Sequence, residues 1–152
     1  MPELIMGASL GVICKDCGTG YRVSSGGGFI FHKLHCDQCG KEKDVLFMEI
    51  EDLHSRYLKG LKVPYSTATL AHDKYVQENY KGEPIPAKEY YREIENYAGK
   101  CDCGGNYTFT ATSRCPNCKS TNYEPTGDLL LYDWYSIKLI SSIFLSLFYY
   151  SI

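Results

Sequence analysis

The stretch CKDCG, residues 14–18, is the first of four similar stretches on which the fold of this chain depends. The 152-residue sequence holds eight cysteines in four close pairs: Cys14/Cys17, Cys36/Cys39, Cys101/Cys103 and Cys115/Cys118. Three pairs enclose two residues, whereas CDCGG, residues 101–105, encloses one between its cysteines. Two cysteines this close reach one ion when the chain between them turns tightly, and two such turns complete a four-sulfur shell. The pairs therefore predict metal-binding knuckles.

The first two pairs are predicted to share one metal ion. Eighteen residues separate Cys17 from Cys36, which agrees with the spacing of four-cysteine zinc sites. Gly18 and Gly40 follow the second cysteine of each pair, where the turn favours a positive φ and a close approach of backbone to sulfur. We expect this segment to form one closed metal module.

The last two pairs are predicted to share a second ion. Eleven residues separate Cys103 from Cys115, and NYTFTAT, residues 106–112, alternates like a strand between them. Gly104 occupies the place of Gly18, whereas Lys119 replaces the corresponding glycine after Cys118. The one-residue spacing predicts a tighter turn that still presents both sulfurs to one ion.

A reactive dithiol at Cys101/Cys103 is the alternative interpretation of that pair. Thioredoxin-type pairs normally stand alone at the start of a helix in an α/β unit, whereas each pair here has a match at loop distance. His32 and His35 lie just before Cys36 and could replace a cysteine ligand, but four cysteines already complete each shell. Metal binding by all eight cysteines is therefore favoured.

Composition places the chain among folded soluble proteins of one domain or two small ones, with 44% hydrophobic residues and a net charge of −2. This charge argues against a dedicated duplex-DNA binder. The N-terminal residues lack a positively charged region followed by an apolar run, so we expect no secretory signal and a cytoplasmic location. Thiols stay reduced there, which favours metal ligands over disulfides.

Between the cysteine-rich segments the sequence changes to helical periodicity. In the first segment, 21–23 and 29–31 are predicted to pair as a hairpin around a 24–28 turn. Helices are predicted over 48–61, 70–80 and 87–99. Their apolar stripes predict core faces: Ile50, Leu53, Tyr57 and Leu61 on the first, and Tyr90, Tyr91, Ile94, Tyr97 and Ala98 on the third. His54 and His72 are expected at the surface or partly buried.

The last twenty residues differ from the rest of the chain. No charged residue follows Lys138, and residues 134–152 would span about 28 Å as a helix, just short of a bilayer core. A C-terminal membrane anchor, an apolar segment packed on the protein or on a partner, and an extension with no role are three competing interpretations.

Both cysteine-rich segments resemble zinc ribbons, the β-hairpin zinc domains built on rubredoxin-type knuckles. The resemblance is carried by CKDCG, CDQCG, CDCGG and CPNC, and it covers residues 10–48 and 100–132. It implies three-stranded ribbons that hold two zinc ions through eight thiolates. It implies no activity, because ribbons occur in transcription factors, ribosomal proteins, enzymes and interaction modules alike.

The predicted architecture is α+β: a zinc ribbon in 1–48, a helical insert in 49–99, a second ribbon in 100–132 and an apolar tail in 133–152. The sequence contains no recognisable catalytic grouping, and closed four-ligand sites lack the open position of catalytic zinc. We therefore expect a non-catalytic adaptor or accessory module that binds a protein or a nucleic acid, with a protein partner favoured.

Three alternatives to this function remain open. The first is an RNA- or DNA-binding module acting through a basic first ribbon, with contacts from Lys15, Arg22, Lys33 and Lys41. The second is a rubredoxin-like electron-transfer protein, because a four-thiolate shell holds iron as well as zinc. The third is a membrane-associated protein held by the C-terminal tail.

Overall fold

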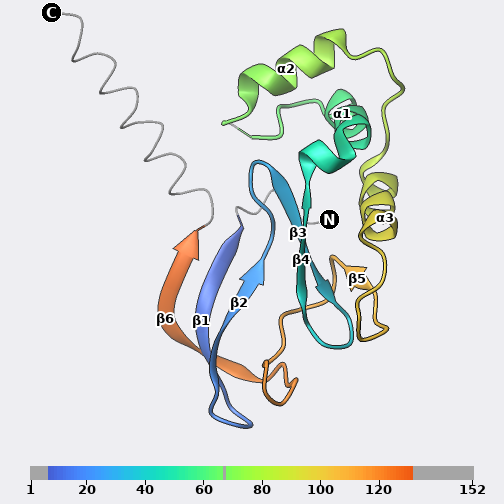
Figure 1. Cartoon of the computed structure of the whole chain (residues 1–152). Helices are drawn as coiled ribbons and strands as arrows, with labels where there is room; N and C mark the ends of the chain where they lie inside the picture. The colour runs from blue at the N-terminus through green and yellow to red at the C-terminus, as the bar shows by residue number, and fades with distance from the viewer. Residues whose placement is uncertain (1–6, 67, 132–152) are drawn as a thin grey trace, which may run out of the picture.

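The computed structural model describes residues 7–66 and 68–131 (Figure 1). It contains two three-stranded antiparallel sheets and three α-helices, so the predicted α+β class is confirmed. The predicted apolar tail, residues 133–152, lies outside the described residues, and its three interpretations stay predictions. Within the described ranges, no helix combines the length and the apolar character needed to cross a bilayer.

The first sheet joins the two ends of the described chain in the order β2-β1-β6. Strand β1 (Ala8–Cys14) forms a hairpin with β2 (Gly20–Ser25) and pairs on its other edge with β6 (Tyr123–Leu131). The register with β6 shifts between Leu10 and Val12, and a Cβ on Gly11 would lie 2.7 Å from Thr126 Oγ1. The missing side chain therefore allows the strands to approach closely at this bulge.

The second sheet has the order β4-β3-β5. Strand β3 (Phe31–Cys36) lies in the middle, between β4 (Glu42–Leu46) and the two-residue β5 (Tyr107–Thr108). On β3, His32, Leu34 and Cys36 are buried on one face, as the two-residue period of a strand requires, and the intervening His35 is buried as well. The strand predicted over 106–112 is much shorter in the structure, where β5 covers Tyr107–Thr108 alone.

The predicted hairpin between residues 21–23 and 29–31 is wrong. Strands β2 and β3 belong to different sheets, and the glycine-rich segment after Ser25 carries the chain from one sheet to the other. Gly26 has a φ of +70°, and a Cβ on Gly27 would lie 2.3 Å from the Phe31 carbonyl oxygen. The hairpin turns are the cysteine knuckles themselves, which reverse the chain between β1 and β2 and between β3 and β4.

The three predicted helices are confirmed. A 3-10 turn (Phe47–Ile50) leads into α1 (Glu51–Gly60), followed by α2 (Leu70–Asn79) and α3 (Ala87–Ala98). Helix α3 starts after Pro86 and ends at Gly99, whose φ of +70° few other residues adopt. In Figure 1, α1 and α2 lie at one end of the second sheet and the cysteine turns lie toward the other end.

The hydrophobic core lies between the second sheet and the helices. Its buried members are Leu34, Cys36, Val45, Ile50, Tyr57, Ile85, Tyr90, Ile94, Ala98, Cys101 and Tyr107. Leu53, Leu61 and Tyr91 pack against them, so the predicted helical stripes form the core face. Tyr97 is the exception, because it is 51% exposed.

The expectation that His54 lies at the surface or is only partly buried is wrong. Its side chain is buried, its ring stacks on Phe47 with 3.9 Å between centroids, and its Nδ1 lies 2.8 Å from the Tyr90 hydroxyl. The same hydroxyl lies 2.8 Å from Nε2 of His32 on β3. A buried His–Tyr–His chain therefore links α1, α3 and β3. Helical periodicity could not reveal it, since the three residues come from separate elements.

Candidate metal centres

All four cysteine pairs fold as the same type of turn. In the first, the Cys14 N–H donates to the Thr19 carbonyl and the Gly18 N–H donates back to the Cys14 carbonyl, both at 2.9 Å. The equivalent bonds of two other knuckles are Cys36 N–Lys41 O, Gly40 N–Cys36 O, Cys115 N–Ser120 O and Lys119 N–Cys115 O. These paired bonds hold the two cysteines of each knuckle on one side of the turn.

The residue after the second cysteine has a positive φ in every knuckle. Gly18, Gly40 and Gly104 have φ values of +73°, +75° and +90°. Lys119 has a φ of +63° and is the one non-glycine residue with a positive φ in the described part of the chain. The substitution at Lys119 thus leaves the turn unchanged and places a lysine in a conformation that favours glycine.

The C-x-C pair forms the same turn with one residue fewer. The Cys101 N–H donates to the Gly105 carbonyl at 2.8 Å, and the Gly104 N–H donates to the Cys101 carbonyl at 2.9 Å. A Cβ on Gly105 would lie 2.6 Å from Cys36 Sγ. The CDCGG sequence therefore supplies both the short turn and the room for a facing cysteine.

The sulfur atoms form two groups, and the predicted assignment of pairs to sites is wrong. The outer group combines the first and last pairs, Cys14, Cys17, Cys115 and Cys118. The inner group combines the middle pairs, Cys36, Cys39, Cys101 and Cys103. Neighbouring pairs in the sequence were expected to meet, but β6 pairs with β1 and β5 pairs with β3, which brings distant knuckles together.

Each group has the geometry of a four-thiolate shell. The ligand atoms of a group all lie within 4.8 Å of one another. Sulfur–sulfur distances between facing knuckles are 3.5 Å for Cys14–Cys118 and Cys17–Cys115, and 3.4 and 3.7 Å for Cys36–Cys103 and Cys39–Cys101. Tetrahedral ligation at a metal–sulfur distance of about 2.3 Å places sulfurs about 3.8 Å apart. Each group could therefore hold one metal ion.

Hydrogen bonds and neighbouring sulfurs shift the pKa values of the cysteine thiols in different directions. In the outer group, the Thr19 hydroxyl lowers the pKa of Cys17 to about 6. In the inner group, hydrogen bonds from the Cys103 backbone and from Tyr107 lower the pKa of Cys101 to about 6. The Gly105 backbone favours the thiolate of Cys103 too, yet the adjoining sulfurs raise the pKa of Cys103 to about 12. Four thiolates this close repel one another, so a cation is needed to hold them all ionised.

Hydrogen bonds outside the sulfurs lock the facing knuckles together. At the inner group, the Asp37 N–H donates to the Asn106 carbonyl at 3.0 Å, and the Asn106 N–H returns a bond of 2.9 Å to Asp37 Oδ1. At the outer group, the Lys15 N–H donates to the Asn122 carbonyl, and Asn122 Nδ2 donates to Asp16 Oδ1 at 3.0 Å. These hydrogen bonds therefore fix which knuckles face each other at each site.

Most of the basic residues predicted to contact nucleic acid are engaged by carboxylates. Arg22 pairs with Asp128, and Lys41 Nζ lies 2.8 Å from Asp102. Lys33 Nζ lies 3.0 Å from Glu42 and 2.7 Å from Asp44. Lys15 is exposed beside the outer group.

The two histidines near Cys36 belong to neither sulfur group. His35 Nε2 lies 3.0 Å from Ser113 Oγ and 3.6 Å from a Glu42 carboxylate oxygen. A nucleophilic relay places its hydroxyl and carboxylate on opposite ring nitrogens, whereas here both approach the same nitrogen. Sequence reasoning missed this contact, because 78 positions separate Ser113 from His35 and no motif joins them.

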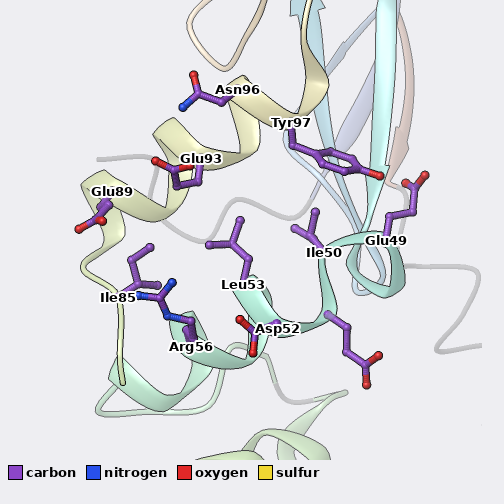
Figure 2. A pocket seen from close by; sticks show the side chains of 11 residues that line it. Glu49, Ile50, Asp52, Leu53, Arg56, Ile85, Glu89, Glu93, Asn96 and Tyr97 are labelled. Carbon is purple, nitrogen blue, oxygen red and sulfur yellow. The ribbon is translucent and has the colours of Figure 1, made fainter. Parts of the chain in front are cut away.

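A groove of about 640 Å³ lies between α1 and α3, away from both sulfur groups (Figure 2). Ile50, Leu53 and Ile85 supply its apolar floor. Five carboxylates and one guanidinium line it: Glu49, Glu51, Asp52, Glu89, Glu93 and Arg56. Tyr97 adds an exposed aromatic ring at one end. Sequence periodicity predicted a core face with Ile50 and Leu53, but it predicted neither Ile85 in the floor nor this acidic opening, which exists only because α1 and α3 lie side by side.

A family model described as "Domain of unknown function (DUF8255)" matches residues 10–124. The match contains all eight cysteines and the three helices between them. No curated protein and no solved structure matches the chain.

Proposed function

The chain belongs to the DUF8255 family, whose function is unknown, and we propose that it is a zinc-stabilised, non-catalytic protein-interaction module. Two zinc ions would hold the folded chain, and the acidic groove between α1 and α3 would bind a partner. The observation that carries the proposal is the nested arrangement of the cysteines, in which each four-sulfur group joins segments at least 60 residues apart.

A structural role agrees with the geometry of both groups. Four thiolates fill a tetrahedral shell and leave no position for water or substrate, which is the arrangement of structural zinc. Each ion would close a long loop of the chain, so metal binding and folding would be coupled. The knuckle turns also support the assignment of both sites to the zinc-ribbon class, although each site combines strands from distant segments.

Zinc is the metal we propose for both groups. A four-thiolate tetrahedron accepts iron as well, and rubredoxin-like electron transfer is the corresponding alternative. The loops between knuckles differ from those of rubredoxin, which favours zinc. Visible absorption of the oxidised protein separates the two metals directly.

The groove supports a protein partner rather than a nucleic acid. Its apolar floor and acidic rim complement an amphipathic helix with lysine or arginine on its polar face, a common mode of groove recognition. Carboxylates repel phosphates, and the basic residues predicted for nucleic-acid binding are largely paired with acids. We therefore propose a basic amphipathic helix as the bound segment.

Metal analysis of the purified chain tests the structural part of the proposal. We expect two zinc ions per chain and loss of tertiary structure when a strong chelator removes them. A content of one ion or none after mild purification, or a folded structure that survives complete chelation, would contradict it.

A peptide-binding experiment tests the interaction part. The probe is a labelled 14-residue amphipathic helix of leucine and lysine, and the variant is Glu89→Lys/Glu93→Lys. We expect this variant to weaken binding at least about 10-fold, because two rim charges reverse. The matched control Glu78→Lys/Glu124→Lys makes the same charge change outside the groove. Equal weakening by both variants would mean that the peptide senses only net charge.

A further inference from the structure

A second cavity, of about 730 Å³, lies between the two sheets and has no part in the function proposed above. One wall comes from the first sheet and includes Leu10, Val23 and Leu129. The opposite wall comes from the second sheet, α3 and the segment after β5, and includes His32, Tyr91 and Phe109. This volume is in the range of small-molecule sites, which often form where two structural units meet.

The aromatic wall is held in a fixed arrangement. The rings of Tyr91 and Phe109 meet edge to face, with centroids 5.0 Å apart. Both rings also contact His32, at 6.0 and 5.6 Å between centroids. His32 is itself held by its hydrogen bond to Tyr90. A planar ligand would therefore meet a preformed aromatic surface with little rearrangement.

A polar strip crosses the cavity between the two walls. The backbone N–H of Ser24 donates to Ser113 Oγ at 3.1 Å, and Ser113 Oγ lies 3.0 Å from His35 Nε2. Thr110 and Thr112 add exposed hydroxyl-bearing side chains to the lining. Hydroxyls both donate and accept hydrogen bonds. The strip can therefore match a ligand edge on which donors and acceptors alternate.

Over the part of its lining that the structure describes, the cavity offers no unpaired lysine, arginine or carboxylate side chain to a ligand. Among the described residues that line it, Lys33 is the one member of the lysine, arginine and carboxylate classes, and Glu42 and Asp44 already bind its ammonium group. Burial lowers the pKa of His32 to about 3, so this imidazole is neutral at physiological pH. A phosphate or carboxylate buried here would lack a counter-charge, which selects an uncharged ligand.

We propose that this inter-sheet cavity binds an uncharged heteroaromatic ring of the nucleobase type, stacked on the Tyr91 ring with Phe109 at its edge and hydrogen-bonded to the hydroxyl groups of the polar strip. The aromatic wall favours a planar ring over an aliphatic chain. The polar strip favours a heteroaromatic ring over a hydrocarbon ring. The lack of an unpaired lysine or arginine in the described lining favours the base over its phosphates.

Such a ring has two sources, a free nucleoside and an unpaired base of a single strand. Binding of the metal-loaded full chain to the four ribonucleosides, to ATP and to an octamer of uridine distinguishes them. We expect saturable nucleoside binding and no gain in affinity from the triphosphate. Binding of the octamer alone, at this cavity, would assign the ring to a strand and retain the proposal.

The matched variants are Tyr91→Leu and Tyr97→Leu, two tyrosines of α3 of which only the first lines the cavity. Loss of a stacked ring should weaken binding about 10-fold in Tyr91→Leu and leave Tyr97→Leu unchanged. Thr112→Val, an exposed lining position, gives a second variant that spares the core. We expect it to weaken binding by a smaller factor.

Amide chemical shifts of the unaltered chain locate the ligand independently of any variant. Shifts should change at Ser24, at His35 and over 109–113. The proposal is overturned by changes confined to the acidic groove or the knuckles, by equal effects of Tyr91→Leu and Tyr97→Leu, or by much tighter, salt-sensitive binding of ATP. It is also overturned if none of the probes binds at millimolar concentration.

Discussion

The outer and inner sulfur groups are built from the same type of cysteine knuckle but lie in different surroundings. Cys36 and Cys101 of the inner group belong to the hydrophobic core, together with Tyr107 beside them. The outer group serves a sheet that contributes no residue to that core cluster, and of β6 only the two end residues are partly buried. Metal therefore reinforces a packed core at the inner site and takes the place of a core at the outer site.

Chelation should produce the largest effect and the clearest difference between the two regions. Structural zinc contributes about 10–16 kcal/mol of apparent binding free energy, comparable to or larger than the whole stability of a small domain. As chelator is added stepwise, amides of β1, β2 and β6 should lose hydrogen-exchange protection before those of β3 and α3. Simultaneous loss at a single chelator concentration would show that the two regions do not differ in their dependence on metal.

The buried His–Tyr–His chain makes a second test, which concerns the inner region alone. Tyr90→Phe removes the hydroxyl and leaves His32 Nε2 and His54 Nδ1 without their shared partner. We expect the free energy of unfolding to fall by about 1–3 kcal/mol, measured by denaturant titration of the metal-loaded chain. Tyr97→Phe, at an exposed position of the same helix, should change it by less than about 0.5 kcal/mol.

The pH dependence of stability gives a third test. Burial lowers the pKa of His54 from 6.5 to about 4, so between these values the unfolded chain binds a proton that the folded chain does not. Stability contributed by neutral His54 is therefore complete above pH 6.5 and is lost as pH falls toward 4.

We expect His54→Gln to flatten the dependence of unfolding free energy on pH in this window. The slope should decrease by at most about 1.4 kcal/mol per pH unit, the value for one proton. His72→Gln replaces an exposed histidine of α2 and serves as the control. An unchanged slope in His54→Gln would mean that His54 does not remain neutral on folding.

The smallest expected effect concerns the one knuckle without a glycine. Lys119→Gly should raise stability by roughly 0.5–1 kcal/mol, because glycine adopts the positive φ of this position without a steric cost. Gly18→Ala, in the facing knuckle, should lower stability by a similar amount. If Lys119→Gly destabilises the chain, the hydrogen bond from Lys119 Nζ to the Pro116 carbonyl contributes more than the steric cost of the positive φ.

Local features of the sequence predicted much of this structure, because their causes are local. Helical periodicity placed α3 correctly, and the glycines after the cysteines predicted the knuckle turns. The alternation over 106–112 overestimated β5, since only Tyr107 and Thr108 find a partner strand.

The partnership of the knuckles could not be predicted in this way. It depends on β6 pairing with β1 and on β5 pairing with β3. No rule on the spacing of cysteines predicts contacts between segments so far apart in the sequence. The same holds for Ser113 beside His35 and for Tyr90 between two histidines. Spacing identified which residues could bind metal, and only the topology decided which of them bind together.

Metal content of two double variants tests the nested assignment most directly. Cys14→Ser/Cys115→Ser removes two ligands from the outer group and should leave one tightly bound metal ion per chain by native mass spectrometry. Cys14→Ser/Cys36→Ser removes one ligand from each group and should leave none. The reverse outcome, with one ion kept by Cys14→Ser/Cys36→Ser and none by Cys14→Ser/Cys115→Ser, would contradict the account and restore two sites built from neighbouring pairs.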